Sequence, residues 1–307
     1  MSVAIVTGAN GFVGRHLCDE LVRHGWQVRV ITRGPAPVET RKLNVAIGAE
    51  RDTLASAFTG ADVVYHLAGI AHEQVARANP EALTALNVDA SVDVLAAADS
   101  AGVPQVVWLS SIKVLGDSSA RPLLPNDPYR PGDAYARSKV RAEQALQDFS
   151  PHATQLAVVR PPLVYGAGVA GNFLRLLQWV DRGLPLPLAS ATGRRSMVGA
   201  DNLCDLLRCL GKPSSGIFHV ADRRDLSLAE LIAALCAALG RPNRLWPLSK
   251  NLLARLARLA GREATYSRLF DPLQVDQSRT SAMLGWQPPY GNEQQLEVTA
   301  KWFRQQQ

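Results

Sequence analysis

The first two thirds of the chain alternate short apolar runs with helical patterns, and this alternation constrains the fold more than any other feature. Six runs are rich in β-branched residues and almost continuously apolar, as strands buried on both faces of a parallel sheet are. They cover Val3–Val6, Gln27–Ile31, Asn44–Ile47, Asp62–His66, Gln105–Leu109 and Gln155–Val159. Helical patterns lie between them, at about Val13–His24, Leu54–Phe58, Pro80–Ala101 and Ala134–Phe149. This order predicts an α/β fold built on a doubly wound parallel sheet.

A glycine-rich turn, TGANGFVG at residues 7–14, joins the first strand to the first helix. In this context Gly8 allows a tight turn, Gly11 lets the backbone approach a pyrophosphate, and Gly14 permits close helix–strand packing. The free N–H groups at the start of the helix would then face the diphosphate. The turn predicts a dinucleotide site, with a purely structural turn as the alternative.

The pattern changes after residue 165, where prolines and glycines cluster. Further helical patterns follow at 202–210, 228–239 and 251–260, with a strand-like run at Gly216–Val220 among them. We therefore expect a Rossmann-type NAD(P)-binding domain over residues 1–165. A smaller mixed α/β substrate-binding lobe is expected over residues 166–307, partly interleaved with the first domain.

The chain is basic, with a formal net charge of +6. Such a charge suits nucleic acid, an acidic membrane surface or anionic small molecules. The arginines are dispersed, and neither an aromatic–basic motif nor a helix-turn-helix pattern accompanies them. We therefore expect no nucleic-acid partner and assign the charge to ligand phosphates.

No apolar run approaches the ~20 residues that a membrane-spanning helix needs, so no span is expected. The segment Leu248–Arg258 is amphipathic and basic, which fits a helix over a cleft, the commoner case, or a helix on a membrane surface. The four cysteines form no CxxC pair, and a strand-like run follows Met1 without a signal peptide, so a reducing cytoplasm is expected. The six histidines show no ligand spacing, which predicts no metal site, and His66 is expected to be packed rather than catalytic.

The end of the second strand bears on cofactor choice. NAD-selective sites usually place an acid there to bind the ribose 2′-hydroxyl. This chain has Ile31, Thr32 and Arg33 instead. A guanidinium suits a 2′-phosphate by charge and geometry, so NADP(H) is favoured over NAD(H), although Arg33 could equally be a solvated surface residue.

A tyrosine and a lysine four residues apart, Tyr135 and Lys139, begin the helix predicted after the fifth strand. They share one helical face, and a neighbouring ammonium lowers the pKa of a phenol toward working pH. Ser110 and Ser111 follow the Gln105–Leu109 strand, at the sheet edge where open α/β folds bind their ligands. The pattern indicates a proton donor and acceptor, with a chance surface pair as the alternative.

Six motifs together resemble the extended short-chain dehydrogenase/reductase family, in its nucleotide-sugar branch: TGANGFVG, HLAG at 66–69, Asn87, SSIKVLG at 110–116, YARSK at 135–139 and RPPLVYG at 160–166. The resemblance implies that Ser111, Tyr135 and Lys139 are catalytic, because Ser111 rather than Ser110 stands at the family's spacing. It also implies a homodimer and a set of residues around the cofactor. That set is Gly8, Asn10, Gly11, Phe12, Val13, Gly14, Arg33, Leu67, Ala68, Gly69, Asn87, Ser110, Tyr135, Lys139, Pro161 and Val164.

On the substrate side the resemblance is looser. Asn172 and Arg194 resemble positions that hold the nucleotide-sugar diphosphate, with Arg195 as the alternate to Arg194 and Arg268 as a second clamp. Lys113 either contacts the substrate or pairs with a nearby acid.

Dehydratases of this family carry an acid pair directly after the active-site hydroxyl, where this chain has Ile112 and Lys113. Without that acid, dehydration is disfavoured. Arg33 favours a reductase that consumes NADPH over a 4-epimerase that retains NAD. The motifs resemble the bacterial surface-polysaccharide branch, including O-antigen enzymes, which implies 4-ketoreduction of a UDP-4-keto-6-deoxy-N-acetylhexosamine-like sugar. The alternatives are an NAD-dependent UDP-hexose 4-epimerase, a non-catalytic NAD(P)-binding regulator and a reductase of non-sugar carbonyls.

Overall fold

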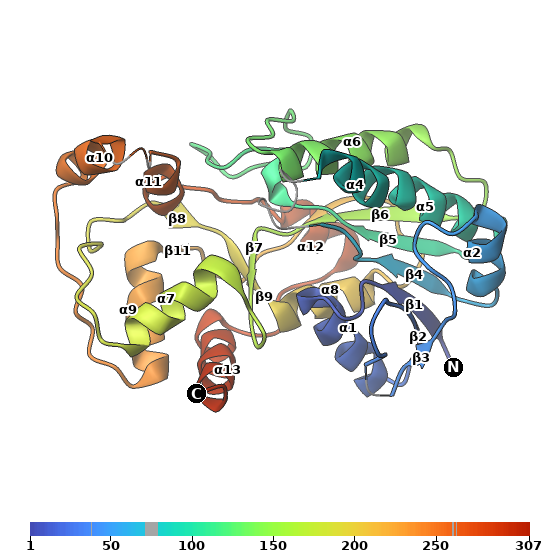
Figure 1. The fold of residues 1–307 in the computed structure, drawn as a ribbon, viewed down its shortest axis with the longest axis horizontal. Coiled ribbons are helices and arrows are strands. Elements are labelled where there is room, and N and C mark those ends of the chain that lie inside the picture. Colours follow the sequence, from blue (N-terminus) through green and yellow to red (C-terminus); the bar gives the residue numbers. More distant parts are fainter. Residues whose placement is uncertain (38, 71–78, 260, 262) are drawn as a thin grey trace.

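The computed structural model describes residues 1–37, 39–70, 79–259, 261 and 263–307. Its centre is a seven-stranded parallel sheet with the order β10-β6-β5-β4-β1-β2-β3 (Figure 1). The strands are β1 (Val3–Thr7), β2 (Gln27–Ile31), β3 (Arg41–Lys42), β4 (Val63–His66), β5 (Gln105–Leu109), β6 (Gln155–Arg160) and β10 (Gly216–His219). The strand order reverses between β1 and β4, which is where such sheets bind nucleotides. The predicted α/β doubly wound fold is confirmed.

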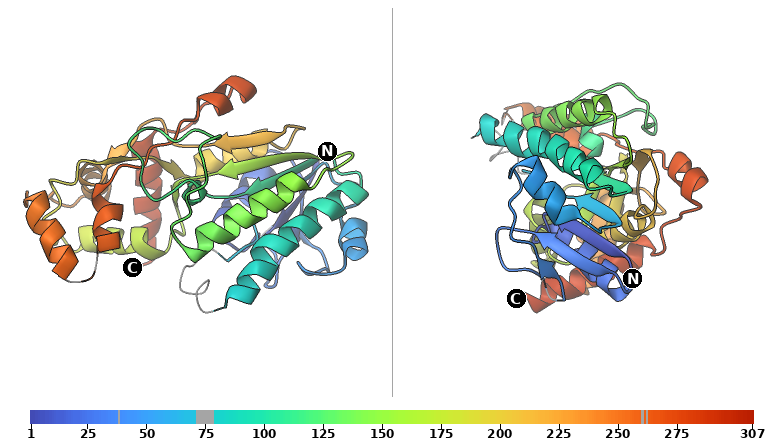
Figure 2. Two further views of the ribbon diagram at one scale, coloured as in Figure 1. Left: turned by 90° about the horizontal axis from the view of Figure 1, so that it is seen from above. Right: turned by 90° about the vertical axis from the view of Figure 1, so that its right-hand side faces the viewer.

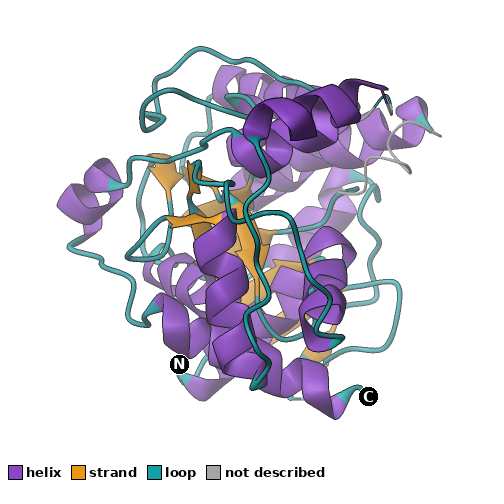
Figure 3. Cartoon of the chain, turned by 90° about the vertical axis from the view of Figure 1, so that its left-hand side faces the viewer, coloured by secondary structure: helices purple, strands orange, loops and turns teal. Residues whose placement is uncertain are grey.

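Helices cover both faces of this sheet (Figures 1 and 3). On one face lie α1 (Phe12–Arg23) and α8 (Ala200–Cys209), whose leucines pack against alternate residues of the strands. On the other lie α2 (Arg51–Phe58), α5 (Ala90–Ser100) and α6 (Ala134–Asp148). Because both faces are covered, the strands read as continuous apolar runs.

The third strand differs from the sequence prediction. Residues 44–47 form no strand, and β3 is the two-residue segment Arg41–Lys42 at the sheet edge. Leu43, Val45 and Ile47 instead pack on the core under α2 and α5. Their alternating apolar pattern arises from this packing and not from a hydrogen-bonded ladder, so the predicted strand Asn44–Ile47 is wrong.

The helical pattern predicted over 80–101 is one helical segment with an internal irregularity. It comprises α4 (Pro80–Thr84), a π-helical turn η1 (Ala85–Asp89) and α5. Such π turns often occur at functional sites. The sequence did not predict this turn, which contains Asn87.

The chain after residue 165 builds a second group of elements and also returns to the main sheet. Strand β10 lies beside β6, and α8 packs against α1, so the two halves interleave. The strand-like run at 216–220 therefore belongs to the large sheet and not to the smaller lobe. The division into domains near residue 165 stays a prediction.

The smaller lobe holds two short strand pairs and several helices (Figures 1 and 2). β7 (Leu163–Tyr165) pairs with β9 (Met197–Gly199), and β8 (Arg194–Arg195) pairs with β11 (Leu226–Ser227). The core of the lobe lies among α7 (Gly171–Asp181), α9 (Leu228–Leu239) and α13 (Asn292–Gln305). The remaining helices are α10 (Lys250–Leu259), α11 (Glu263–Phe270), α12 (Ser278–Leu284) and the 3₁₀ turn η2 (Ile112–Val114).

Local sequence explains where the lobe's central helix begins and ends. Ser227 and Glu230 form a capping box at the start of α9, which satisfies two backbone N–H groups. Gly240 ends the helix in the left-handed conformation, which glycine adopts without strain.

Candidate active site

The glycine-rich turn has the geometry that the sequence predicts. Gly8 has φ +71°, and a Cβ there would lie 2.8 Å from the backbone nitrogen of Ala68. A Cβ on Gly14 would lie 2.2 Å from the Gly8 carbonyl oxygen, so this glycine lets α1 approach β1 closely. Gly11 caps α1 without a side-chain hydrogen bond, which leaves N–H groups of the first turn for an anion. The turn therefore fits the diphosphate of a dinucleotide.

A chain of buried hydrogen bonds holds the loop after β4 against this turn. The Ala68 N–H donates to Thr7 Oγ1 at 3.2 Å, and the same oxygen lies 2.7 Å from His66 Nδ1. On its other side His66 Nε2 lies 3.2 Å from Ser91 Oγ. Burial, aided by the charge of Lys139, lowers the pKa of His66 to about 3. His66 is thus a packed, neutral residue, as predicted.

Asn87, in the π turn, joins the loop after β4 to α6. Its side-chain oxygen accepts from the Ile70 N–H at 2.7 Å, and its amide donates to Ser138 Oγ at 2.9 Å. A Cβ on Gly69 would lie 3.0 Å from the Asn87 side-chain oxygen and 3.7 Å from Lys139 Nζ. Asn87 therefore places the Leu67–Gly69 loop beside the candidate catalytic lysine.

The structure brings the three predicted catalytic residues together. Ser111 follows β5 and caps η2, and Tyr135 lies in the first turn of α6, which Asp133 caps through the Ala136 N–H at 2.7 Å. Tyr135 and Ser111 share a side-chain hydrogen bond. Lys139, 5% exposed, donates to the Leu109 carbonyl at 2.8 Å, and its Nζ lies 4.4 Å from the centre of the Trp108 ring.

The electrostatics of this cluster correct one expectation. Burial raises the pKa of Tyr135 to about 12, while its hydrogen bond with Ser111 acts in the opposite direction. Burial lowers the pKa of Lys139 to about 8, and Glu143 partly opposes this shift. The expected lowering of the tyrosine pKa by Lys139 is absent here, since the ammonium is turned toward the Leu109 carbonyl. Tyr135 is therefore protonated at neutral pH and suited to donate a proton.

A buried ion pair beneath the site was missed by the sequence analysis. Arg160 and Glu143, 1% and 0% exposed, are joined by hydrogen bonds of 2.9 Å from Nε to Oε1 and 2.5 Å from Nη2 to Oε2. Ser110 donates to the same carboxylate, and so does the Tyr129 hydroxyl, at 2.8 Å. Ser110 thus supports the position of Ser111. The sequence did hold a signal for this ion pair: Arg160 ends the apolar run of β6, where a charged residue needs a buried partner.

Residues 4–219 match the NAD dependent epimerase/dehydratase family. The chain belongs to this family. The chain is 32% identical to UDP-glucose 4-epimerase of Vibrio cholerae, over 98% of this chain and 95% of that protein. It is also 32% identical to ceramide reductase of Caulobacter vibrioides, over 79% of this chain and 72% of that protein.

Solved structures show the same fold. MoeE5 in complex with UDP-glucose and NAD aligns with a TM-score of 0.79 at 23% identity, over 100% of this chain and 99% of that one. The predicted membership of the extended short-chain dehydrogenase/reductase type is confirmed. The chain is an enzyme of a family of nucleotide-sugar epimerases and reductases that depend on NAD-type cofactors.

In this chain, the end of β2 carries positive charge. Arg33 is exposed, and Lys42 on β3 donates to the Gly34 carbonyl at 2.9 Å, which brings a second cation to the same place. Asn10 donates to the Pro35 carbonyl at 2.9 Å and ties this loop to the glycine-rich turn. The sequence analysis missed Lys42 because it placed the third strand at residues 44–47.

The other predicted cofactor residues surround the same edge of the sheet. A Cβ on Gly166 would lie 3.6 Å from Phe12, so this ring packs under the loop after β7. The Pro161 carbonyl accepts from the Ile112 N–H at 2.9 Å, and Val164 lies in β7. Val13 and Leu67 pack against the core of the sheet. Their contacts to a cofactor stay predictions.

Arg194 and Arg195, on the two-residue strand β8, point to different partners. Arg194 binds the Asp225 carbonyl at 2.8 Å and Glu230 Oε1 at 3.1 Å, away from the triad. Arg195 reaches the Asp117 carbonyl at 3.2 Å, in the loop after Ser111 and η2. Of the two arginines, Arg195 is thus the one that contacts the loop after Ser111, and the diphosphate role of either stays a prediction.

The remaining substrate candidates are placed as follows. Lys113 pairs with Asp133, which is 3% exposed, and its Nζ lies 6.0 Å from the centre of the Tyr135 ring. Of the two roles predicted for Lys113, the contact with Asp133 favours pairing with an acid over contact with the substrate. Asn172 is exposed in the first turn of α7. Arg268 lies in α11, and its side chain is outside the described part of the structure.

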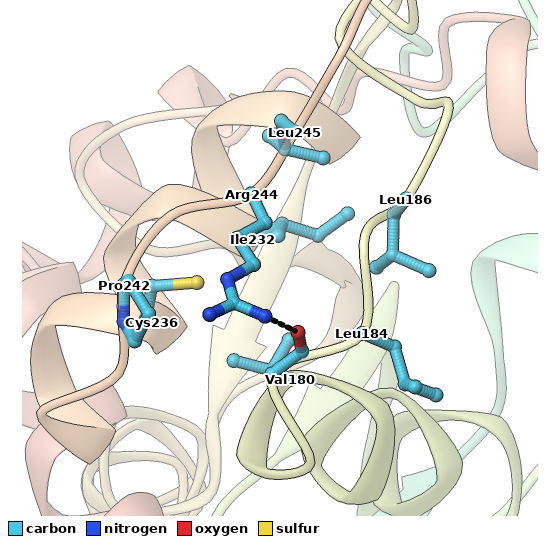
Figure 4. A pocket seen from close by; sticks show the side chains of 9 residues that line it. Val180, Leu184, Leu186, Ile232, Cys236, Pro242, Arg244 and Leu245 are labelled. Carbon is cyan, nitrogen blue, oxygen red and sulfur yellow. Dashed lines mark hydrogen bonds between the residues drawn. The ribbon is translucent and has the colours of Figure 1, made fainter.

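The apolar pocket between α7 and α9 is a separate feature (Figure 4). Val180, Ile232, Cys236 and Leu245 line it, and Arg244 closes one side by donating to the Gly183 carbonyl at 3.2 Å. Its volume of about 10 Å³ is close to one water-sized sphere. It is a packing defect of the lobe and holds no substrate. Among the described residues, no cluster of metal-ligating side chains occurs.

The lowered pKa of Lys139 predicts a pH profile. We expect kcat/KM to be constant below about pH 8 and to fall about tenfold per pH unit above it, because Lys139 loses its charge there. Tyr135 keeps its proton to about pH 12, so its ionisation does not cause the fall in kcat/KM above about pH 8. Initial rates across a series of buffers at constant ionic strength test the profile. A flat profile through about pH 10 would contradict the role of the charge.

Proposed function

We propose that this enzyme reduces the 4-keto group of a nucleotide-activated sugar with NADPH. The observation that carries the proposal is the acid-free end of β2, where Arg33 and Lys42 offer two cations to a 2′-phosphate. A cofactor that is consumed and replaced in each turnover suits a reductase, whereas an epimerase retains its NAD. The similarity to ceramide reductase supports carbonyl reduction by this type of site.

The residues of the site fit this reaction. When bound, the reduced nicotinamide supplies a hydride for C4 of the sugar. Tyr135, protonated and hydrogen-bonded to Ser111, donates its proton to the C4 oxygen as negative charge develops there. Ser111 donates to the same oxygen and so stabilises the charge. Lys139, beside Gly69, holds the cofactor ribose with its ammonium.

NAD-dependent UDP-hexose 4-epimerisation is the second candidate. It is favoured by the 32% identity to the Vibrio cholerae UDP-glucose 4-epimerase over almost the full length of both chains. Both reactions use the same proton donor at C4. A non-catalytic regulator is disfavoured by the assembled triad, and the missing acid at Ile112 and Lys113 disfavours a dehydratase.

The finer features of the proposal are the substrate, the compartment and the assembly. We propose a UDP-4-keto-6-deoxy-N-acetylhexosamine-like substrate, a cytoplasmic location, a homodimer and a role in surface polysaccharide synthesis, as for O-antigen. Arg195 on β8 and Asn172 in the first turn of α7 would bind the diphosphate.

Two parallel assays test the proposal. NADPH oxidation is followed with UDP-4-keto-6-deoxy-GlcNAc, and epimerisation of UDP-glucose and UDP-GlcNAc is followed without added cofactor. The reductase proposal expects NADPH oxidation that depends on the keto sugar. Epimerisation by the enzyme as isolated, without NADPH oxidation, would replace it with the epimerase.

Replacing Arg33 by serine tests the cofactor preference. We expect Arg33→Ser to raise KM for NADPH by about 10- to 100-fold, since a charged hydrogen bond contributes about 1.5–3 kcal/mol, and to leave KM for NADH almost unchanged. Arg23→Ser is the matched control. The Arg23 side chain is 57% exposed, and it lies at the C-terminal end of α1, whereas the glycine-rich turn lies at the N-terminal end. Steady-state titration of both cofactors measures the effect. An equal change for NADPH and NADH would contradict selection by Arg33.

A further inference from the structure

Helix α10 lies at the end of the molecule farthest from the large sheet (Figures 1 and 2). It packs mainly against α11, and the Tyr266 hydroxyl of α11 donates to the Lys250 carbonyl at 3.3 Å. The helix therefore does not lie on the sheet, and most of its side chains remain exposed. The sequence analysis favoured a helix packed over a cleft, which this arrangement does not support.

The exposed side of α10 carries leucines. Leu252 is 44% exposed and Leu259 is 86% exposed, and their spacing of seven residues puts them on one helical face. The half-buried residues Leu253, Ala254 and Ala257 lie on the remaining side. Exposed apolar side chains that share one face of a surface helix indicate an interaction site for a partner or an apolar medium.

The flank of this leucine face is basic. Arg255 and Arg258 are exposed, and the sequence of α10 contains no acidic residue. Lys250 lies on the opposite side of the helix, where its ammonium donates to Thr192 Oγ1 at 3.0 Å. On the helical wheel Arg255 lies beside Leu259, with Arg258 further along the same exposed arc. Trp246, 44% exposed, precedes the helix by four residues and is of a type enriched at membrane interfaces. Leucines with flanking cations are the pattern of helices that lie in the surface of an anionic bilayer.

The helix is connected to the candidate active site through α11. The Asp271 carbonyl, one residue after α11, accepts from Arg195 at 2.7 Å, and the Leu273 N–H donates to the Arg194 carbonyl at 3.0 Å. A Cβ on Gly193 would lie 2.1 Å from the Phe270 carbonyl oxygen, so this contact is close. Through α11, helix α10 is therefore linked to strand β8, which carries Arg195, the candidate diphosphate ligand.

We propose that α10 docks this enzyme on anionic phospholipid membranes, with Leu252 and Leu259 in the acyl boundary and the cations at the headgroups. The leucines exclude a purely electrostatic partner such as nucleic acid, and the cations distinguish an anionic bilayer from a neutral one. None of the helices in the described ranges is long and apolar enough to cross a bilayer, so the docking is peripheral. The proposal is independent of the substrate and of the cofactor preference.

Vesicle sedimentation tests this docking. The full-length protein is mixed with vesicles of phosphatidylcholine containing about one third phosphatidylglycerol, or with phosphatidylcholine alone. We expect binding to the anionic vesicles only. It should fall by about fivefold for each exposed cation removed, as in Arg255→Ser, and should weaken in about 0.5 M salt. Binding to neither vesicle, or equal binding to both, would overturn the proposal.

A matched pair of substitutions separates the helix from general surface effects. Leu252→Glu is expected to abolish vesicle binding, whereas Val298→Glu, at a residue 42% exposed on α13, should bind like the original protein. Both variants should keep the enzyme's turnover of a water-soluble substrate, so loss of docking is distinguishable from failure of the proposed function. If Leu252→Glu instead dissociates an oligomer in gel filtration, α10 is a subunit interface and the proposal is wrong.

Discussion

Tyr135→Phe is expected to lower kcat by about 10²- to 10⁴-fold, which is the usual contribution of a positioned proton donor. The substitution removes the hydroxyl that Ser111 binds and leaves the ring in place at the start of α6. With no proton to give, the site must neutralise the developing alkoxide from solvent. Stopped-flow measurement of NADPH oxidation, together with cofactor titration by fluorescence, separates the chemical step from binding.

The matched control for this variant is Tyr65→Phe. The Tyr65 hydroxyl is buried in β4 and has no hydrogen-bond partner within the described part of the chain. Its removal is therefore expected to leave kcat unchanged. A Tyr135→Phe enzyme with near-original turnover and an intact melting temperature would show that another group donates the proton.

Glu143→Gln is expected to lower the free energy of unfolding by about 3–5 kcal/mol, because it leaves the buried guanidinium of Arg160 without a counter-charge. The amide matches the carboxylate in shape, so the loss reports charge and hydrogen bonding and not a cavity. The amide keeps one acceptor oxygen, so either Ser110 or Tyr129, which donate to different oxygens of the carboxylate, would also lose its acceptor. Urea unfolding followed by circular dichroism measures the change.

An exposed ion pair supplies the comparison for this experiment. Arg224 and Glu293 lie 2.8 Å apart with side chains 56% and 69% exposed. Solvent screens such a pair, so Glu293→Gln should change stability by less than about 1 kcal/mol. Equal effects of the two substitutions would show that the Glu143–Arg160 pair contributes no more than a surface contact.

The predicted fold depended on patterns that are local in the chain. Strands β1, β2, β4, β5 and β6 were found because burial on both faces makes each of them an apolar run. The third strand was misplaced because a two-residue edge strand has no such pattern, while Val45 and Ile47 beyond it pack on the core and belong to no strand. The position of β10 in the large sheet was also missed, since periodicity identifies a strand but not its neighbours.

The sequence by itself determined the glycine-rich turn and the shared helical face of Tyr135 and Lys139, because both follow from spacing within one strand–turn–helix unit or one helix, whereas the choice of Ser111 came from the family resemblance. Gly8 and Gly14 needed only the β1–α1 connection, and Tyr135 and Lys139 needed only α6. The tertiary structure alone decided which arginine of β8 faces the catalytic loop, that Lys42 joins Arg33, and that Glu143 neutralises Arg160. These contacts join distant segments, and burial, which sets the pKa values of Tyr135 and Lys139, exists only after the chain has packed.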